Sequence, residues 1–117
     1  MKITPDILEN MYATIYCCYP YTKWNMPLPE QIKFEVSDDP TVHGTYIYDD
    51  GEKFEHIITI SRATCGHFMT VFRTLAHEAV HMSRWNHVGE KWLHHDKVFR
   101  QRCKMVANEL GLDPLEL

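Results

Sequence analysis

The chain contains 117 residues, of which 44% are hydrophobic and 24% are charged, which fits one globular domain over residues 1–117 and leaves no room for a second. With a formal net charge of −4, the chain lacks the positive electrostatic potential of a stand-alone DNA-binding domain. No apolar run is long enough for a membrane span, and none near the start has the form of a signal peptide, so no membrane association is expected.

The first predicted element is a helix that ends before Pro20. Thr4 is a candidate N-cap, and Pro5 suits the first helical position, where the backbone amide hydrogen is not needed. Apolar residues then recur at helical spacing: Ile7, Leu8, Met11, Tyr12, Ile15, Tyr16 and Tyr19. Such a stripe is more often core than a binding surface, so this helix is expected to be structural.

Three strands are predicted after a proline-containing loop at 24–29. Residues 31–37 alternate between apolar and charged side chains, as a half-buried strand does. Residues 44–48 and 54–61 are predicted to form a hairpin about a turn at 49–51. The second arm of the hairpin is rich in β-branched residues and leads toward a histidine-containing segment.

Two helices complete a predicted α+β fold. The first begins near Thr70 and has apolar residues at helical period, with His77 and His81 one turn apart. The second runs from about 96 to 110 and ends at Gly111, a residue that suits a helix C-terminus. Four residues of this last helix are expected to be buried: Val98, Phe99, Met105 and Val106.

The four cysteines favour neither a disulfide framework nor a zinc ribbon. Cys17 and Cys18 are adjacent, Cys65 and Cys103 stand alone, and no CxxC pair exists. We therefore expect a cytoplasmic protein in a reducing compartment, with the thiols filling the core.

The histidine-containing helix carries His77-Glu78-Ala79-Val80-His81, which has the form HExxH. The spacing of four puts both imidazoles on one face of a helix, near enough to share a tetrahedral ion. One zinc ion per chain is the expected cofactor, because imidazole suits Zn²⁺ and three protein ligands leave a position for water. Glu78 is then placed to act as the general base on that water in peptide-bond hydrolysis.

The residues themselves leave the third ligand open among His87, His94 and His95. His87 has the spacing of the HExxHxxGxxH pattern, but Arg84 replaces the glycine that lets the chain turn sharply there. His94 and His95 lie at the start of the last helix, where a side chain can point back across the preceding one.

These motifs resemble the SprT-like (Spartan-like) metallopeptidase family, in which HExxH is followed by a third histidine in an H-G-x-x-F/W motif that opens the next helix. Residues 95–99, His-Asp-Lys-Val-Phe, are similar to that motif, with Asp96 in place of the glycine. The resemblance therefore implies His95 as the third metal ligand, since His94 would put Val98 where the family has its aromatic residue. Supporting similarities lie at 27–29, 44–46, 73–75 and 85–89.

The same resemblance implies a small zincin-like domain that cleaves proteins or peptides, with the substrate lying along an edge strand at 57–61. Some relatives act on proteins attached to DNA and carry a zinc ribbon, which this chain lacks. Others are small phage or bacterial proteins, which agrees with action in the cytoplasm, including that of a phage-infected host.

Two other functions stay open. A non-catalytic, zinc-stabilised protein-binding module would use the metal only to hold the core together. A nucleic-acid-associated factor would use a basic stretch near the end of the chain: Lys97, Arg100, Arg102 and Lys104. The remaining histidines before the motif are expected to be surface or hydrogen-bonded residues, and the tyrosines of the hairpin to be packing residues: His43, His56, His67, Tyr46 and Tyr48.

Overall fold

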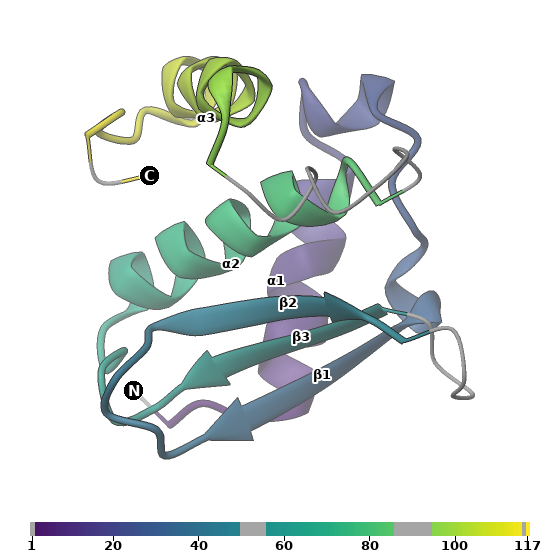
Figure 1. Cartoon of the computed structure of the whole chain (residues 1–117). Coiled ribbons are helices and arrows are strands. Elements are labelled where there is room, and N and C mark those ends of the chain that lie inside the picture. Colours follow the sequence, from purple (N-terminus) through teal and green to yellow (C-terminus); the bar gives the residue numbers. More distant parts are fainter. Residues whose placement is uncertain (1, 50–55, 86–94, 116) are drawn as a thin grey trace.

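The computed structural model describes residues 2–49, 56–85, 95–115 and 117. Its helices are α1 (Pro5–Tyr16), α2 (Phe68–Met82) and α3 (Lys97–Leu110), and its strands are β1 (Ile32–Ser37), β2 (Gly44–Tyr48) and β3 (His56–Ser61). Two short 3₁₀ turns, Tyr21–Lys23 and Pro29–Gln31, lie between α1 and β1. In Figure 1, α2 lies between the sheet and α3, while α1 crosses behind the sheet. The predicted α+β fold, with an N-terminal helix, a three-stranded sheet and two later helices, is confirmed.

The sheet is mixed, with the strand order β1-β3-β2. Strand β3 pairs with β2 in the antiparallel sense, which confirms the predicted hairpin, and with β1 in the parallel sense. The turn predicted at 49–51 lies largely outside the described residues. The prediction of an edge strand at 57–61 is wrong, because both sides of β3 are paired. Within the described part of the chain, the edges of this sheet are β1 and β2.

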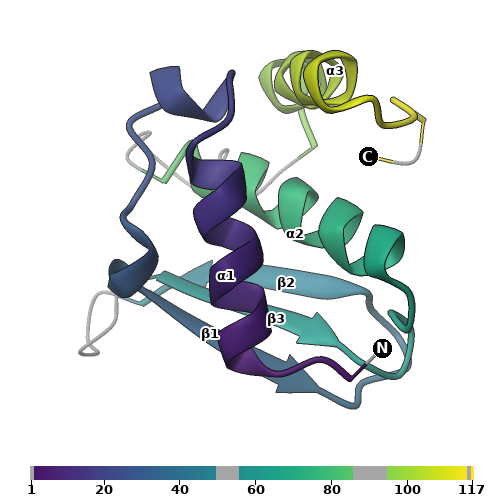
Figure 2. The ribbon, with the colours of Figure 1, turned by 180° about the vertical axis from the view of Figure 1, so that it is seen from behind.

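Helices α1 and α2 cover one face of the sheet. Phe34 on β1 and Tyr46 on β2 are both register partners of Ile58 on β3, so these three side chains share a face. On that face the Phe34 ring lies 5.8 Å from the ring of Tyr12 in α1. Figure 2 shows the same arrangement from behind, with α1 in front of the sheet and α3 on the side of α2 away from the strands.

The helix ends follow the predicted capping signals. The Thr4 hydroxyl accepts a hydrogen bond from the Ile7 amide at 3.2 Å, and Gly111 ends α3 in the left-handed region with φ of 71°. Helix α1 ends at Tyr16, so Tyr19 lies outside it and is 49% exposed. The expected burial of Val98 is wrong, since α3 turns a different face inward and leaves Val98 40% exposed. The inward-facing residues of α3 are Phe99, Cys103, Val106 and Ala107.

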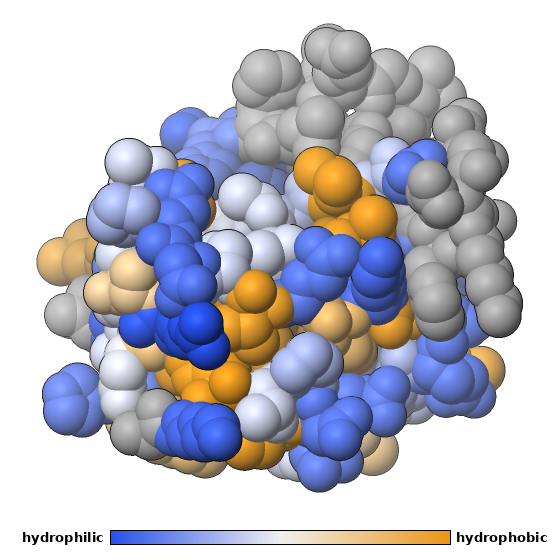
Figure 3. All heavy atoms as spheres, turned by 90° about the horizontal axis from the view of Figure 1, so that it is seen from below, coloured by the Kyte–Doolittle hydropathy of each residue, from blue (hydrophilic) through white to orange (hydrophobic). Residues whose placement is uncertain are grey.

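The thiols divide into two groups. Cys65 and Cys103 are buried as expected, whereas Cys17 is exposed and Cys18 partly so, because both follow the end of α1 at the surface. On the face seen in Figure 3, hydrophilic side chains surround several smaller hydrophobic groups. None of the helices in the described ranges has the length and apolar content needed to cross a lipid bilayer.

Candidate metal centre

Helix α2 places two of the predicted ligands one turn apart. His77 and His81 lie on the same side of the helix because four residues advance it by slightly more than one turn. Their ring centroids are 5.0 Å apart, with His81 buried and His77 partly buried. The helix itself is anchored by fully buried residues on its core-facing side: Val71, Leu75, Ala76, Ala79 and Val80.

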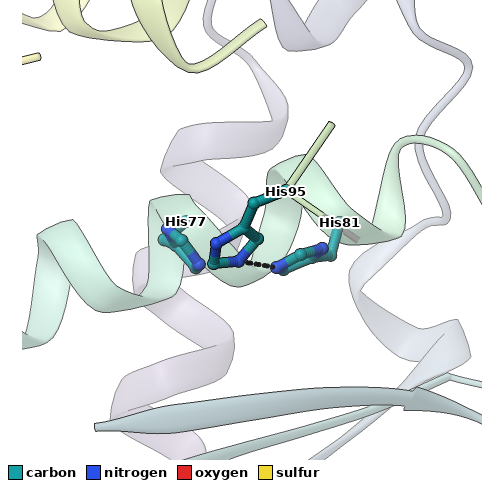
Figure 4. A group of neighbouring side chains, drawn as sticks. All are labelled: His77, His81 and His95. Carbon is teal, nitrogen blue, oxygen red and sulfur yellow. Dashed lines mark hydrogen bonds between the residues drawn. The ribbon is translucent and has the colours of Figure 1, made fainter. Parts of the chain in front are cut away.

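His95 comes from the segment just before α3 and completes a cluster with the two α2 histidines. Figure 4 shows its ring between those of His77 and His81. One ring nitrogen from each residue lies within 4.8 Å of the others, and Nε2 of His95 is 3.0 Å from Nε2 of His81. Two imidazole nitrogens bound to one tetrahedral zinc would be about 3.3 Å apart, given Zn–N distances of about 2.0–2.1 Å. These three side chains therefore fit a single metal ion.

The other two candidates for the third ligand, His87 and His94, lie outside the described residues. Among the residues that are described, the only His, Cys, Asp or Glu cluster suited to a metal consists of three histidines. Such a set leaves a coordination position for water or substrate, as catalytic zinc sites do.

Phe99 packs against all three imidazoles. Its ring is stacked on those of His81 and His95, at centroid distances of 4.2 and 4.6 Å, and lies edge-on to His77 at 5.1 Å. The Phe99 side chain is 3% exposed. The aromatic residue of the second motif therefore forms one wall of the histidine cluster and restricts how the rings can turn.

A backbone oxygen from the last described residue fixes the tautomer of His77. Nδ1 of His77 lies 2.5 Å from the oxygen of Leu117, an atom that can only accept a hydrogen bond. Nδ1 therefore donates, and Nε2 keeps the lone pair that a metal requires. Burial lowers the pKa of His77, which also favours the neutral imidazole that can bind a metal. A backbone acceptor this far along the chain leaves no signal in the sequence.

Glu78 lies beside the histidines and is 6% exposed. Burial raises the pKa of its carboxyl group to about 7, because desolvation disfavours the charged form. A group that titrates near neutrality can both accept and return a proton.

Two neighbouring cavities open between β2 and α2 at the histidine cluster. One, of about 280 Å³, is lined by Gly44, Thr45, Tyr46, His77, Glu78, His81 and His95. The other, of about 450 Å³, is lined by Val42, His43, Gly44, Arg73, Thr74, His77, Glu78 and Leu117. A Cβ atom at Gly44 would lie 2.9 Å from Thr74 Cγ2, so glycine allows β2 to lie this close to α2.

Two arginines join the end of α2 to α3, and the sequence analysis missed both contacts. Arg84 donates two hydrogen bonds to the Asp96 carboxylate, at 2.6 and 3.0 Å. Arg102 donates to the backbone oxygen and the hydroxyl of Ser83, at 3.1 and 2.7 Å. The hydrogen bonds from Arg84 and from the Phe99 amide lower the pKa of Asp96 to about 2. The sequence predicted that a helix begins near Asp96, and this position at a helix start was the signal that could have identified Asp96 as a contact residue.

The remaining predicted residues do not belong to the three-histidine group, although His43 and Tyr46 line the cavities beside it. His56 is buried and its Nδ1 lies 2.8 Å from the Tyr46 hydroxyl, while His43 and His67 are exposed. The group of three histidines that could hold a metal includes none of them. Tyr46 and Tyr48 pack against the His56 ring, as expected for packing residues.

Only three of the four cations in the basic stretch lie on the same exposed surface. Lys97, Arg100 and Lys104 are exposed on α3 and follow one helical face. Arg102 points elsewhere, because its guanidinium group contacts Ser83 and stacks over the Trp24 ring at 4.8 Å. Three of the four cations therefore share an exposed face of α3, and Arg102 does not belong to it.

Comparison of the chain with protein-family models, curated proteins and solved structures finds no significant match. The resemblance to SprT-like metallopeptidases therefore stays a prediction from the motifs. What the chain can do has to be argued from the three histidines, the buried carboxyl group and the cavities beside them.

Proposed function

We propose that this chain is a zinc-dependent metalloendopeptidase in which His77, His81 and His95 hold the ion and Glu78 is the general base. The observation that carries the proposal is the grouping of three histidine nitrogens within 4.8 Å of one another, next to a buried glutamate on the same helix. Three nitrogen ligands with an open position and a neighbouring carboxylate are typical of hydrolytic rather than purely structural zinc sites.

Zinc would polarise the scissile carbonyl and acidify a water molecule. Glu78 accepts a proton from the attacking water and returns it to the leaving amine. Phe99 and the Leu117 oxygen keep the imidazoles in the orientation and tautomer that a metal needs.

Strand β2 is the expected place for the substrate. It is an edge strand among the described residues and borders both cavities through Gly44. An extended peptide can add to such an edge through its backbone hydrogen-bonding groups, which would carry a scissile bond past Glu78. This assignment replaces the edge at 57–61 that the sequence predicted.

The test is the Glu78→Gln variant, which keeps the size of the side chain but removes its basicity. We expect hydrolysis of a fluorescently labelled unfolded protein to fall by about 100-fold to 10,000-fold, with one zinc ion per chain retained. Glu35→Gln, a change on the exposed face of the sheet, is the matched control and should leave the rate unchanged. Full activity in Glu78→Gln would show that the assigned base is wrong.

The alternative is a non-catalytic module in which zinc joins α2 to the start of α3. It is favoured by one observation, namely that the three ligands come from two separate elements that a metal would link. Thermal unfolding with and without a chelator distinguishes the two functions when it is read beside the rate. A large drop in Tm in a chain that never cleaves a protein substrate would favour the module.

A further inference from the structure

We propose that Arg84 and Asp96 are positioning residues for the metal centre, and that their ion pair sets the place of His95 and hence the affinity for zinc. This inference rests on the proposed metal site. With Arg102 and Ser83, the two residues form an interhelix clamp that joins the end of α2 to the beginning of α3. None of these four residues is itself a proposed ligand.

The first part of the clamp is a fork-to-fork contact. Nη1 and Nη2 of Arg84 donate to Oδ1 and Oδ2 of Asp96 at 2.6 and 3.0 Å, and the Arg84 side chain is only 5% exposed. Two parallel hydrogen bonds between planar groups restrain orientation as well as distance. The position of the Asp96 carboxylate is therefore fixed relative to the end of α2.

The same carboxylate also caps α3. Oδ1 of Asp96 accepts a hydrogen bond from the Phe99 amide at 3.0 Å, as an N-cap residue does. A single side chain thus contacts both the end of α2 and the first turn of α3. His95 immediately precedes it, so the direction in which His95 leaves the backbone depends on where Asp96 is held.

In the second part of the clamp, the arginine lies on α3 and its acceptors lie at the end of α2. Arg102, on α3, donates to the backbone oxygen and the hydroxyl of Ser83, the C-cap residue of α2. A cation at the C-terminal end of a helix also interacts favourably with the helix dipole. The Arg102 guanidinium group is held from its other side by the Trp24 ring, at 4.8 Å. The two helices are therefore joined by contacts from each to the other.

His95 depends on this clamp because no regular helix holds its backbone. It is exposed and precedes α3, with its ring stacked on Phe99 and its backbone oxygen accepting a hydrogen bond from Arg100 at 3.0 Å. His77 and His81, by contrast, are held by a helix whose inner face is buried. Metal affinity depends on holding each ligand close to its productive position, so loss of the clamp should act on zinc through His95.

A merely structural ion pair would behave differently. Buried arginine–carboxylate pairs often contribute little net stability, because desolvation offsets the attraction between the charges. The measurement that separates the two roles is therefore metal binding rather than the free energy of unfolding. Cobalt substitution gives a second readout, since the visible spectrum of a bound Co²⁺ ion reports the geometry of its ligands.

The experiment compares Asp96→Asn and Arg84→Lys with the wild-type chain. Asparagine is also a good N-cap, so Asp96→Asn keeps α3 capped while losing the charged fork, and Arg84→Lys keeps the charge while losing the fork. We expect zinc affinity, measured by competition with a chelator, to fall about 10-fold to 100-fold in each variant, with an altered Co²⁺ spectrum. Helix content by circular dichroism should stay at the wild-type level.

Asp38→Asn is the matched control, because Arg62 contacts Asp38 through two of its nitrogens at a fully exposed site away from the histidines. It should leave zinc affinity unchanged. Zinc affinity within about twofold of wild type in both clamp variants would overturn the clamp alone. A wild-type chain that binds no zinc would overturn the metal site and the clamp together, which distinguishes the two failures.

Discussion

The two helices that build the candidate metal centre provide their ligands in different ways. Helix α2 supplies His77 and His81 from within a helix whose inner face is buried, so helical geometry alone brings the rings together. The α3 side supplies His95 from outside the helix, on an exposed residue whose neighbour Asp96 is held by Arg84. The α2 half of the site is thus set by local structure, and the α3 half by contacts between helices.

Removing one ligand from each half of the site should have the largest effect on zinc binding and tests whether the two halves differ. We expect His81→Ala to abolish zinc retention, because it leaves His77 and His95 on separate elements. His95→Ala should leave weak residual binding, because two histidines four residues apart on a helix still form a chelating pair. The measurement is zinc per chain after gel filtration, followed by a titration that resolves the weaker affinity.

His67→Ala, at an exposed histidine outside the cluster, is the control and should retain the full zinc content. Equal zinc loss in His81→Ala and His95→Ala would mean that the two halves contribute alike. The distinction between local and tertiary positioning would then fail.

A substitution at Phe99 tests how much the folded structure depends on the ring that packs against the histidines of both halves. Replacing it by alanine removes a ring that contacts all three imidazoles and, because Phe99 is only 3% exposed, leaves a buried cavity. We therefore expect the free energy of unfolding to fall by about 3–5 kcal/mol. Urea denaturation of the metal-free chain gives this value. Val98→Ala, one position earlier on the exposed side of α3, should change it by less than about 0.5 kcal/mol.

His56 tests whether the sheet beneath α2 has a pH dependence of its own. Burial lowers the pKa of His56 to about 4, below its ordinary value of 6.5, so the folded chain binds fewer protons than the unfolded chain between these values. Stability should therefore fall as the pH falls from about 6.5 to about 4, by at most about 3 kcal/mol from this group. The slope should be absent above that window.

The His56→Gln variant isolates this contribution, since an amide can hydrogen-bond to the Tyr46 hydroxyl as either donor or acceptor. As the pH falls from 6.5 to 4 in a chelator, the unfolding free energy of the wild type should fall relative to that of His56→Gln. The difference between the two chains cancels the contribution of Glu78, whose raised pKa acts with the opposite sign in the same window. His67→Gln is the matched histidine control, at an exposed position. Parallel pH profiles for His56→Gln and the wild type would contradict the assignment.

The same contrast between local and tertiary positioning explains what the sequence could predict. The helical spacing of four identified His77 and His81 because both ligands depend on one local structure. The capping signals located the start of α1 and the end of α3 for the same reason. His95 required a resemblance to a known motif, since its place depends on how α3 meets α2. Arg84 was noticed only as a residue that replaces a glycine, although its partner Asp96 lies twelve residues later.

The strand order was out of reach for a related reason. A hairpin pattern shows that β2 and β3 are neighbours but not on which side β1 joins them. Because β1 pairs with the free side of β3, the predicted edge strand became the central one and β2 took its place beside the histidines. The Leu117 oxygen that orients His77 is a backbone atom, which no residue pattern can single out.

The N-caps of α1 and α3 allow the smallest and most selective test. Thr4 and Asp96 both accept a hydrogen bond from an amide three residues later, so each alanine variant loses about 1 kcal/mol of capping from the free energy of unfolding. Asp96→Ala should lose more than Thr4→Ala, because it also leaves the buried Arg84 guanidinium group without its carboxylate partner. Only Asp96 also contacts Arg84, and only it adjoins a proposed ligand. Zinc affinity should therefore fall in Asp96→Ala and stay unchanged in Thr4→Ala. Wild-type zinc affinity in both variants would show that Asp96 does not position the metal site.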